Sequence, residues 1–249
     1  MLNLREYADA PTLLADYLPW ACIVAPGVVL NKDGSFQTTF RYRGPDLESS
    51  TEEELVSVMA RVNNVLRRFG SGWALFFEAQ RHEVHDYPEA EFPDALTWLT
   101  DQERSLQAEE AGTRFESSYY LTLLWLPPAD ATGRAEKALI QRAETEDAAT
   151  WRHRLETFQQ HAARVFDLLS TCLADIAKLS DDETLTYLHS TISTRQYRIG
   201  VPDVPFYLDA LLADVALIGG LAPVLHDQHL RVVSVRGFPT STWPGILDD

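Results

Sequence analysis

A nine-residue segment with strict alternation of side-chain type limits most strongly what this chain can fold into. In residues 35–43, one side of the segment carries Phe36, Thr38, Phe40 and Tyr42, and the other carries Gln37, Thr39, Arg41 and Arg43. A period of two with one polar side predicts a half-exposed antiparallel strand. Residues 22–30 are rich in Val and Ile and predict a preceding strand, joined through a turn at Asn31-Lys32-Asp33-Gly34.

A capped helix and a third strand follow this pair. Thr51 and Glu54 form a capping-box pattern, and apolar residues then recur at helical spacing as far as Phe69. Gly70 is expected to end the helix. Residues 73–79 are almost continuously hydrophobic, which predicts a strand covered on both faces, with Phe76 and Phe77 in the core. The order of these elements is therefore ββαβ.

The second half of the chain is expected to be mainly helical. A long helix is predicted from an apolar seam at spacings of four and three, made of Trp151, Leu155, Phe158, Ala162, Val165, Leu169, Cys172, Ile176 and Leu179. The other expected elements are a polar helix at 94–110, a strand at 119–126, a mobile or helical Ala- and Glu-rich arm at 129–149, a helix from a Ser180/Glu183 capping box to about 192, a rigid connector at 201–205, a short helix at 207–217 and a final strand at 229–238.

Together these patterns predict an α+β fold, a mainly antiparallel sheet built on a ββαβ unit and packed against long amphipathic helices. The α/β part is expected at about 18–126, the helical part at about 134–217 and the last strand at about 229–238, within one domain spanning residues 1–249.

The charge balance narrows the classes of partner. The formal net charge is −16 and the pI is about 4.8, which makes a nucleic-acid partner unlikely, because phosphate contacts need clustered Lys and Arg. The same charge disfavours broad adhesion to anionic lipid. Cys22 and Cys172 are expected to be reduced thiols, which suits a cytoplasmic protein. We find neither a signal peptide nor a transmembrane segment in the pattern.

Motifs that would carry chemistry are scarce. No G-x-x-x-x-G-K-[ST] sequence occurs, so the phosphate cradle of a P-loop is not encoded. Two H-x-x-H pairs occur, His82/His85 and His226/His229, but both lie at strand ends rather than on a helix. Zinc would need at least one further ligand. A metal-dependent enzyme that uses one H-x-x-H pair is therefore the alternative function, while no catalytic, cofactor or metal residue is predicted.

Two groups of residues are candidates for docking a partner. Tyr17, Leu18 and Trp20 precede the first strand and form either a strap over the core or an exposed hydrophobic contact. Arg41, Arg43 and Arg81 are expected to share the exposed face of the sheet, where they could meet an acidic surface. For any one of these arginines, an ordinary solvated side chain is the simpler interpretation.

Several longer stretches resemble the amino-terminal domain of the TrbE family of conjugative type IV secretion ATPases. They are LPW at 18–20, APGVVLNKDGSF at 25–36, GSGWA at 70–74 and RVVSVRGFP at 231–239. The resemblance implies a cytoplasmic ATPase at the inner-membrane base of a conjugation apparatus, where it energises pilus assembly and substrate transfer. Its amino-terminal domain would contact inner-membrane components and neighbouring subunits, so self-association is also expected.

In that family ATP and Mg²⁺ belong to a separate P-loop motor domain. With no Walker motif in this sequence, no catalytic residue of the family can be placed on it, and the last residues, 243–249, are expected to mark a truncation point. We therefore expect a docking and assembly domain without cofactor, located at the cytoplasmic face of the inner membrane.

Overall fold

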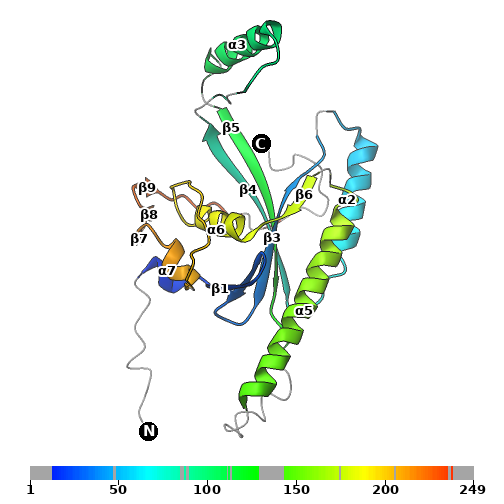
Figure 1. The fold of residues 1–249 in the computed structure, drawn as a ribbon, viewed down its shortest axis with the longest axis vertical. Helices are drawn as coiled ribbons and strands as arrows, with labels where there is room; N and C mark the ends of the chain where they lie inside the picture. Colours follow the sequence, from blue (N-terminus) through cyan, green and yellow to red (C-terminus); the bar gives the residue numbers. More distant parts are fainter. Residues whose placement is uncertain are drawn as a thin grey trace.

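The computed structural model shows an antiparallel sheet between two helical layers (Figure 1). It describes residues 13–46, 49–84, 87, 90–110, 112, 114–128, 143–173, 175–204, 206–234 and 237. The strands lie in the order β1 (Trp20–Ala25), β2 (Val28–Asn31), β3 (Phe36–Arg43), β5 (Arg114–Trp125) and β4 (Trp73–Val84), and β6 (Asp175–Lys178) also pairs with β3. α2 (Glu52–Leu66) and α5 (Ala143–Leu169) cover one face, the α5 face, and α6 (Asp181–Ser190) covers the other, the α6 face. The expected α+β fold with an antiparallel sheet is confirmed.

The segment expected to be one strand at 22–30 is a hairpin. β1 and β2 pair antiparallel on either side of Pro26 and Gly27. Gly27 has φ +62°, and a Cβ there would collide with the carbonyl oxygen of Leu179. Its N–H donates to Asp181 Oδ1 at 2.6 Å, so the turn is fastened to the start of α6. A Pro-Gly turn inside a Val-rich run therefore divides the predicted strand.

The centre of the sheet follows the predicted alternation. β3 pairs with β5 from Phe36↔Trp125 to Tyr42↔Tyr119 without a shift in register. Phe36 and Phe40 lie buried on the α5 face, whereas Thr39 lies on the α6 face. Each face of β3 therefore has a different helical cover.

The Thr51/Glu54 capping box is present at the start of α2, with both reciprocal hydrogen bonds. The expectation that residues 73–79 are covered on both faces is wrong, because β4 is an outer strand of the sheet. Phe76 and Phe77 point to opposite faces and are each about half exposed.

The long apolar seam belongs to two elements instead of one. α5 ends at Leu169, and β6 then pairs antiparallel with β3. Leu155, Phe158, Val165 and Leu169 are buried as predicted, against the sheet and α2. Ile176 lies in β6 and Leu179 just after it, so the helix predicted to reach 179 is ten residues too long. Of the arm expected at 129–149, residues 129–142 lie outside the described residues.

The remaining elements are short. The Ser180/Glu183 capping box starts α6 as predicted, and α1 (Leu14–Tyr17) and α7 (Leu208–Leu212) pack beside it and β1. β7 (Leu217–Ile218), β8 (Val224–Leu225) and β9 (Gln228–His229) form a small second sheet. The strand expected at 229–238 is wrong for residues 230–234, which have no regular structure and expose Val232 and Val233; residues 235, 236 and 238 lie outside the described part.

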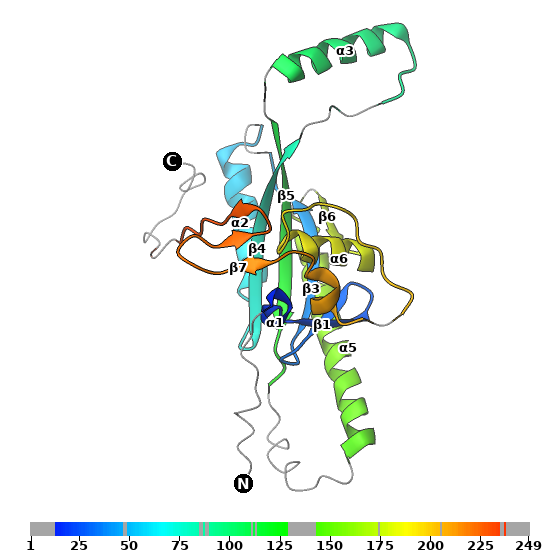
Figure 2. The same ribbon diagram turned by 90° about the vertical axis from the view of Figure 1, so that its left-hand side faces the viewer.

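α3 (Ala95–Glu110) agrees with the predicted helix at 94–110, but its position is unexpected. β4 and β5 pair from Trp73↔Trp125 to Val84↔Arg114, and they continue as a two-stranded ribbon beyond the end of β3. α3 stands past the end of this ribbon, away from the rest of the chain (Figures 1 and 2). No helix among the described residues is long and apolar enough to cross a membrane.

Candidate partner-binding surfaces

The segment before β1 closes over its own core. Leu18 and Trp20 are only 6% and 7% exposed and pack in a cluster with α6 and α7, while Tyr17 is 63% exposed. The backbone N–H of Lys32 donates to the carbonyl of Pro19 at 2.7 Å, and the Lys32 ammonium pairs with Asp209 at 2.7 Å. Of the three aromatic and apolar docking candidates, only Tyr17 presents most of its surface to solvent.

The three arginine candidates do not share one face. Arg41 and Arg43 project from the α6 face, where Arg41 lies opposite Tyr120 and Arg43 opposite Asp175. Arg81 projects to the other side, with its guanidinium carbon 4.6 Å from the centre of the Phe115 ring. A hollow of about 890 Å³ lies beside Arg41 and Arg43, and Asp46, Glu116 and Asp175 line it too, so these two arginines share the hollow with carboxylates of their own chain.

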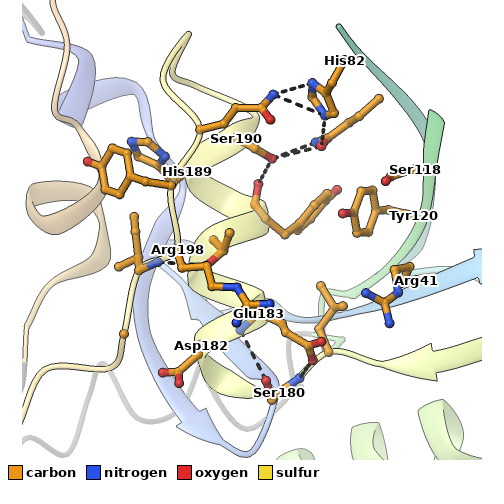
Figure 3. A pocket seen from close by; sticks show the side chains of 18 residues that line it. Arg41, His82, Ser118, Tyr120, Ser180, Asp182, Glu183, His189, Ser190 and Arg198 are labelled. Atoms are coloured by element: carbon orange, nitrogen blue, oxygen red, sulfur yellow. Dashed lines mark hydrogen bonds between the residues drawn. The ribbon is translucent and has the colours of Figure 1, made fainter. Parts of the chain in front are cut away.

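A pocket of about 570 Å³, lined mostly by polar residues, lies between helix α6 and the face of the sheet that α6 covers (Figure 3). Tyr187 is central to it: its hydroxyl donates to Glu78 Oε2 at 2.7 Å and lies 3.2 Å from Thr122 Oγ1. Thr122 in turn lies 2.8 Å from Thr39 Oγ1. Because a carboxylate only accepts, donation runs from Thr39 through Thr122 and Tyr187 to Glu78.

The same hydrogen-bond chain continues toward the outer half of β4. The Gln80 amide donates to Glu78 Oε1 at 2.8 Å and to Ser190 Oγ at 2.9 Å. His82 Nε2 lies 3.3 Å from Gln80 Oε1, and the other ring nitrogen contacts the Gln196 amide. Directional contacts of this kind fix how α6 is placed on the sheet.

The electrostatics of this pocket favour a structural role. Burial raises the pKa of Tyr187 well above its ordinary value, so the phenol stays a neutral donor. Hydrogen bonds from Ser180 lower the pKa of Glu183, aided by Arg41 and Arg198. His189 is buried, with Nε2 3.1 Å from Asp214 Oδ2 and its ring 4.6 Å from that of Tyr197. These groups hold one another in place, and their arrangement does not resemble a nucleophile with its base.

The described residues give no support to the alternative function, a metal-dependent enzyme that uses an H-x-x-H pair. His82 is engaged by Gln80 and Gln196, and His85 lies outside the described residues. His226 has φ 57° at the β8–β9 turn and contacts Arg195, while His229 lies in β9. Within the described part of the chain, no group of three or more His, Cys, Asp or Glu side chains is placed to hold a metal ion.

α3 is a surface that the sequence interpretation missed. Four large apolar side chains on it are between 51% and 74% exposed: Leu96, Trp98, Leu99 and Leu106. Leu96, Leu99 and Leu106 follow one side of the helix together with Glu103. Trp98 lies on another side, next to the partly covered Asp101 and Ser105, and Asp101 accepts a hydrogen bond from the Tyr87 hydroxyl at 2.8 Å. The described side chains of α3 have little cover on any side, so its large apolar side chains meet solvent, unlike those of an ordinary surface helix. The signal was the spacing of Leu96, Leu99 and Leu106.

Comparison with known proteins assigns the family. Residues 27–133 match the family model described as "Type IV secretion system ATPase VirB4/TrbE, N-terminal domain". In Sinorhizobium fredii a "Probable conjugal transfer protein TrbE" is divided into two pieces, and the first piece is 34% identical over 148 residues, which cover 58% of this chain and 99% of that piece. The chain belongs to the VirB4/TrbE family.

Longer VirB4/TrbE relatives align over almost the whole chain. The "Conjugal transfer protein TrbE" of Rhizobium radiobacter is 30% identical over 100% of this chain and 32% of its own length. The "Type IV secretion system protein virB4" of Brucella suis is 26% identical over 94% of this chain and 30% of its own length. This VirB4/TrbE domain thus spans about a third of these two relatives.

Proposed function

We propose that this chain is the docking and assembly domain of a conjugative type IV secretion ATPase. It would link the motor to inner-membrane components at the cytoplasmic face of the bacterial inner membrane, in an apparatus that builds a pilus and transfers substrate. ATP and Mg²⁺ would be handled by a motor domain outside this sequence. The match to the VirB4/TrbE family supports a place in a type IV secretion apparatus, and the names of the TrbE relatives support a role in conjugal transfer.

One observation carries the docking role: α3 stands beyond the end of a ribbon and exposes Leu96, Trp98, Leu99 and Leu106. Exposing a row of large apolar side chains is unfavourable unless another surface covers them. A helix presented in this way is a common mode of protein recognition, in which the apolar side enters a groove. Placing it beyond the sheet gives a partner access without disturbing the core.

The test is capture of inner-membrane components of the same transfer system by the purified chain. We expect loss of capture with Arg41→Glu/Arg43→Glu, with Leu99→Glu/Leu106→Glu, or with both variants. Val56→Glu is the matched control, because Val56 also lies on a helix and is 58% exposed. No capture by the parent chain, or capture that neither variant weakens, would contradict the docking role.

A further inference from the structure

The outer strand β4 has an edge at which no other described strand pairs. The N–H of Leu126 donates to the carbonyl of Gly72 at 2.8 Å, and this bond continues the register of the β4–β5 ladder. Hydrogen-bonded positions alternate in an antiparallel pair, so the even-numbered residues of β4 bond to β5. Leu75, Phe77 and Ala79 therefore direct their backbone N–H and C=O groups toward the open edge.

Two neighbouring phenylalanines lack cover on both faces of the sheet at this edge. Phe76 and Phe77 point to opposite faces, and each is about half exposed. A helix laid on one face would cover one ring and leave the other in water. A further strand beside β4 would place side chains on both faces, so it would cover both rings.

The apolar surface continues beyond Phe77 on the α5 face. This ring lines an apolar groove of about 450 Å³, to which α2 contributes Leu55, Met59 and Leu66. Alternate side chains of an added strand would point to the α5 face and enter the groove next to Phe77. One extended segment could therefore satisfy the backbone edge and fill part of the groove at the same time.

The surroundings of this edge suit a single strand better than a second copy of the chain. Figure 1 shows α2 and the small sheet of β7, β8 and β9 on opposite sides of the main sheet, and Figure 2 shows both toward its β4 margin. A second copy pairing through its own β4 would bring its own α2 and small sheet to the same margin. The net charge of −16 also makes two copies repel each other.

We propose that β4 accepts an extended segment of a different protein as an additional strand of the sheet. The segment is apolar at its centre, where its side chains cover Phe76 on one face and Phe77 on the other. It carries an acidic residue near the exposed Arg81. Backbone hydrogen bonds supply the affinity and the alternating side chains the specificity.

The sequence of β4 agrees with such a use. Proteins usually protect an apolar edge strand with charged residues, proline or a bulge, and residues 73–77 contain none of these. The inference goes beyond the proposed function, because it gives the chain a second contact surface that does not involve α3.

Binding of a synthetic strand to the purified whole chain tests the proposal. The probe is a labelled, capped peptide of about eight residues, with Val and Ile at its centre and Thr, Lys and Glu at its ends. The control peptide has the same sequence with N-methyl groups on the central amides, which keeps the side chains and removes the donors. By fluorescence anisotropy we expect saturable binding of the probe and about tenfold or more weaker binding of the control.

Ala79→Pro is the matching change in the chain. Ala79 is exposed and its N–H points to the open edge, so proline removes one donor there and leaves the β4–β5 ladder intact. Ala79→Thr is the control, because threonine keeps the N–H and favours a strand. We expect Ala79→Pro and Phe77→Glu each to weaken binding of the probe about tenfold or more, and Ala79→Thr to change it little. Circular dichroism checks that all three variants fold.

Hydrogen exchange locates the bound strand. In the complex with the probe, the amide protons of Phe77 and Ala79 should exchange about tenfold or more slowly than in the free chain. The amide protons of Phe76 and Glu78 already bond to β5 and should change less.

Five results would overturn the inference. They are no saturable binding by the parent chain, equal binding of the N-methylated peptide, parent-like binding by both Ala79→Pro and Phe77→Glu, unchanged exchange at Phe77 and Ala79, and a parent dimer that Ala79→Pro separates. The last result would place a second copy at the edge. None of these measurements involves α3, so failure here is distinguishable from failure of the docking role.

Discussion

Replacing Phe158 with alanine tests whether α5 is built into the core of this domain. Phe158 is fully buried, and its ring stacks on Phe36 and Trp73 at 5.8 Å between centroids and on Trp125 at 6.5 Å. These three partners come from β3, β4 and β5, so a single side chain ties the helix to three strands. Removing it leaves a cavity surrounded by large rings that cannot easily close in.

The expected loss follows from that environment. A buried Phe→Ala change typically costs about 3–5 kcal/mol, and rigid surroundings place this site toward the upper end. For a domain of this size, 1 kcal/mol corresponds to about 2–4 °C in melting temperature. We therefore expect the melting temperature to fall by about 6–20 °C.

Thermal unfolding followed by far-ultraviolet circular dichroism measures this directly, with urea unfolding as a check at fixed temperature. Phe76→Ala is the matched control, because Phe76 is a half-exposed phenylalanine on β4 and should cost much less. Equal melting temperatures for Phe158→Ala and the control would refute the packing of α5 on the sheet. A loss that depends on protein concentration would instead place Phe158 at an interface between copies.

Three further predictions concern other parts of the fold. Gly27→Ala should lower the free energy of unfolding by more than about 1 kcal/mol in urea, because residue 27 has positive φ and faces a backbone carbonyl; parent-like stability would contradict this. Trp20→Ala should lower the melting temperature strongly and Tyr17→Ala hardly at all, and equal effects would mean that the strap is placed wrongly. Hydrogen bonds from Ser180 lower the pKa of Glu183 in the folded state. The stability that the ionised Glu183 adds to the folded state is therefore present above the pKa of the unfolded carboxyl group, and it is lost as the pH falls through the lower pKa of the folded state. Glu183→Gln should therefore lower the free energy of unfolding in urea at pH 7, and lower it much less at about pH 3. An equal difference in unfolding free energy between variant and parent at both pH values would refute the capping role.

The features that sequence predicted well are those that local physics determines. The alternation around Phe40, the Thr51 and Ser180 capping boxes and the length of α3 depend on side chains and backbone within a few residues of each other. Each pattern has one low-energy local structure, so little information from elsewhere in the chain is needed.

The errors concern features that distant contacts determine. Ile176 continues the helical spacing of α5, yet it lies in a strand because residues 175–178 pair with β3. Phe77 belongs to an apolar run that is also typical of a buried strand, and only its place at the margin of the sheet leaves it exposed. Arg81 lies on the other face from the one expected, because β4 continues past residue 79, where the pattern predicts its end. The exposure of α3 could not be predicted, since the spacing of Leu96, Leu99 and Leu106 indicates a helix but does not show whether the rest of the protein covers it.

The two-stranded ribbon below α3 has a mechanical consequence. From Gln80↔Ser118 to Val84↔Arg114 the strands pair only with each other among the described residues, over a length of about 17 Å. Hydrogen bonds of Gln80 to Ser190 and of His82 to Gln196 hold the first part of this ribbon to the α6 side, so bending is concentrated beyond His82, next to α3. Such compliance lets a contact at the tip tolerate misalignment, or follow a moving neighbour, while the six-stranded sheet stays unstrained.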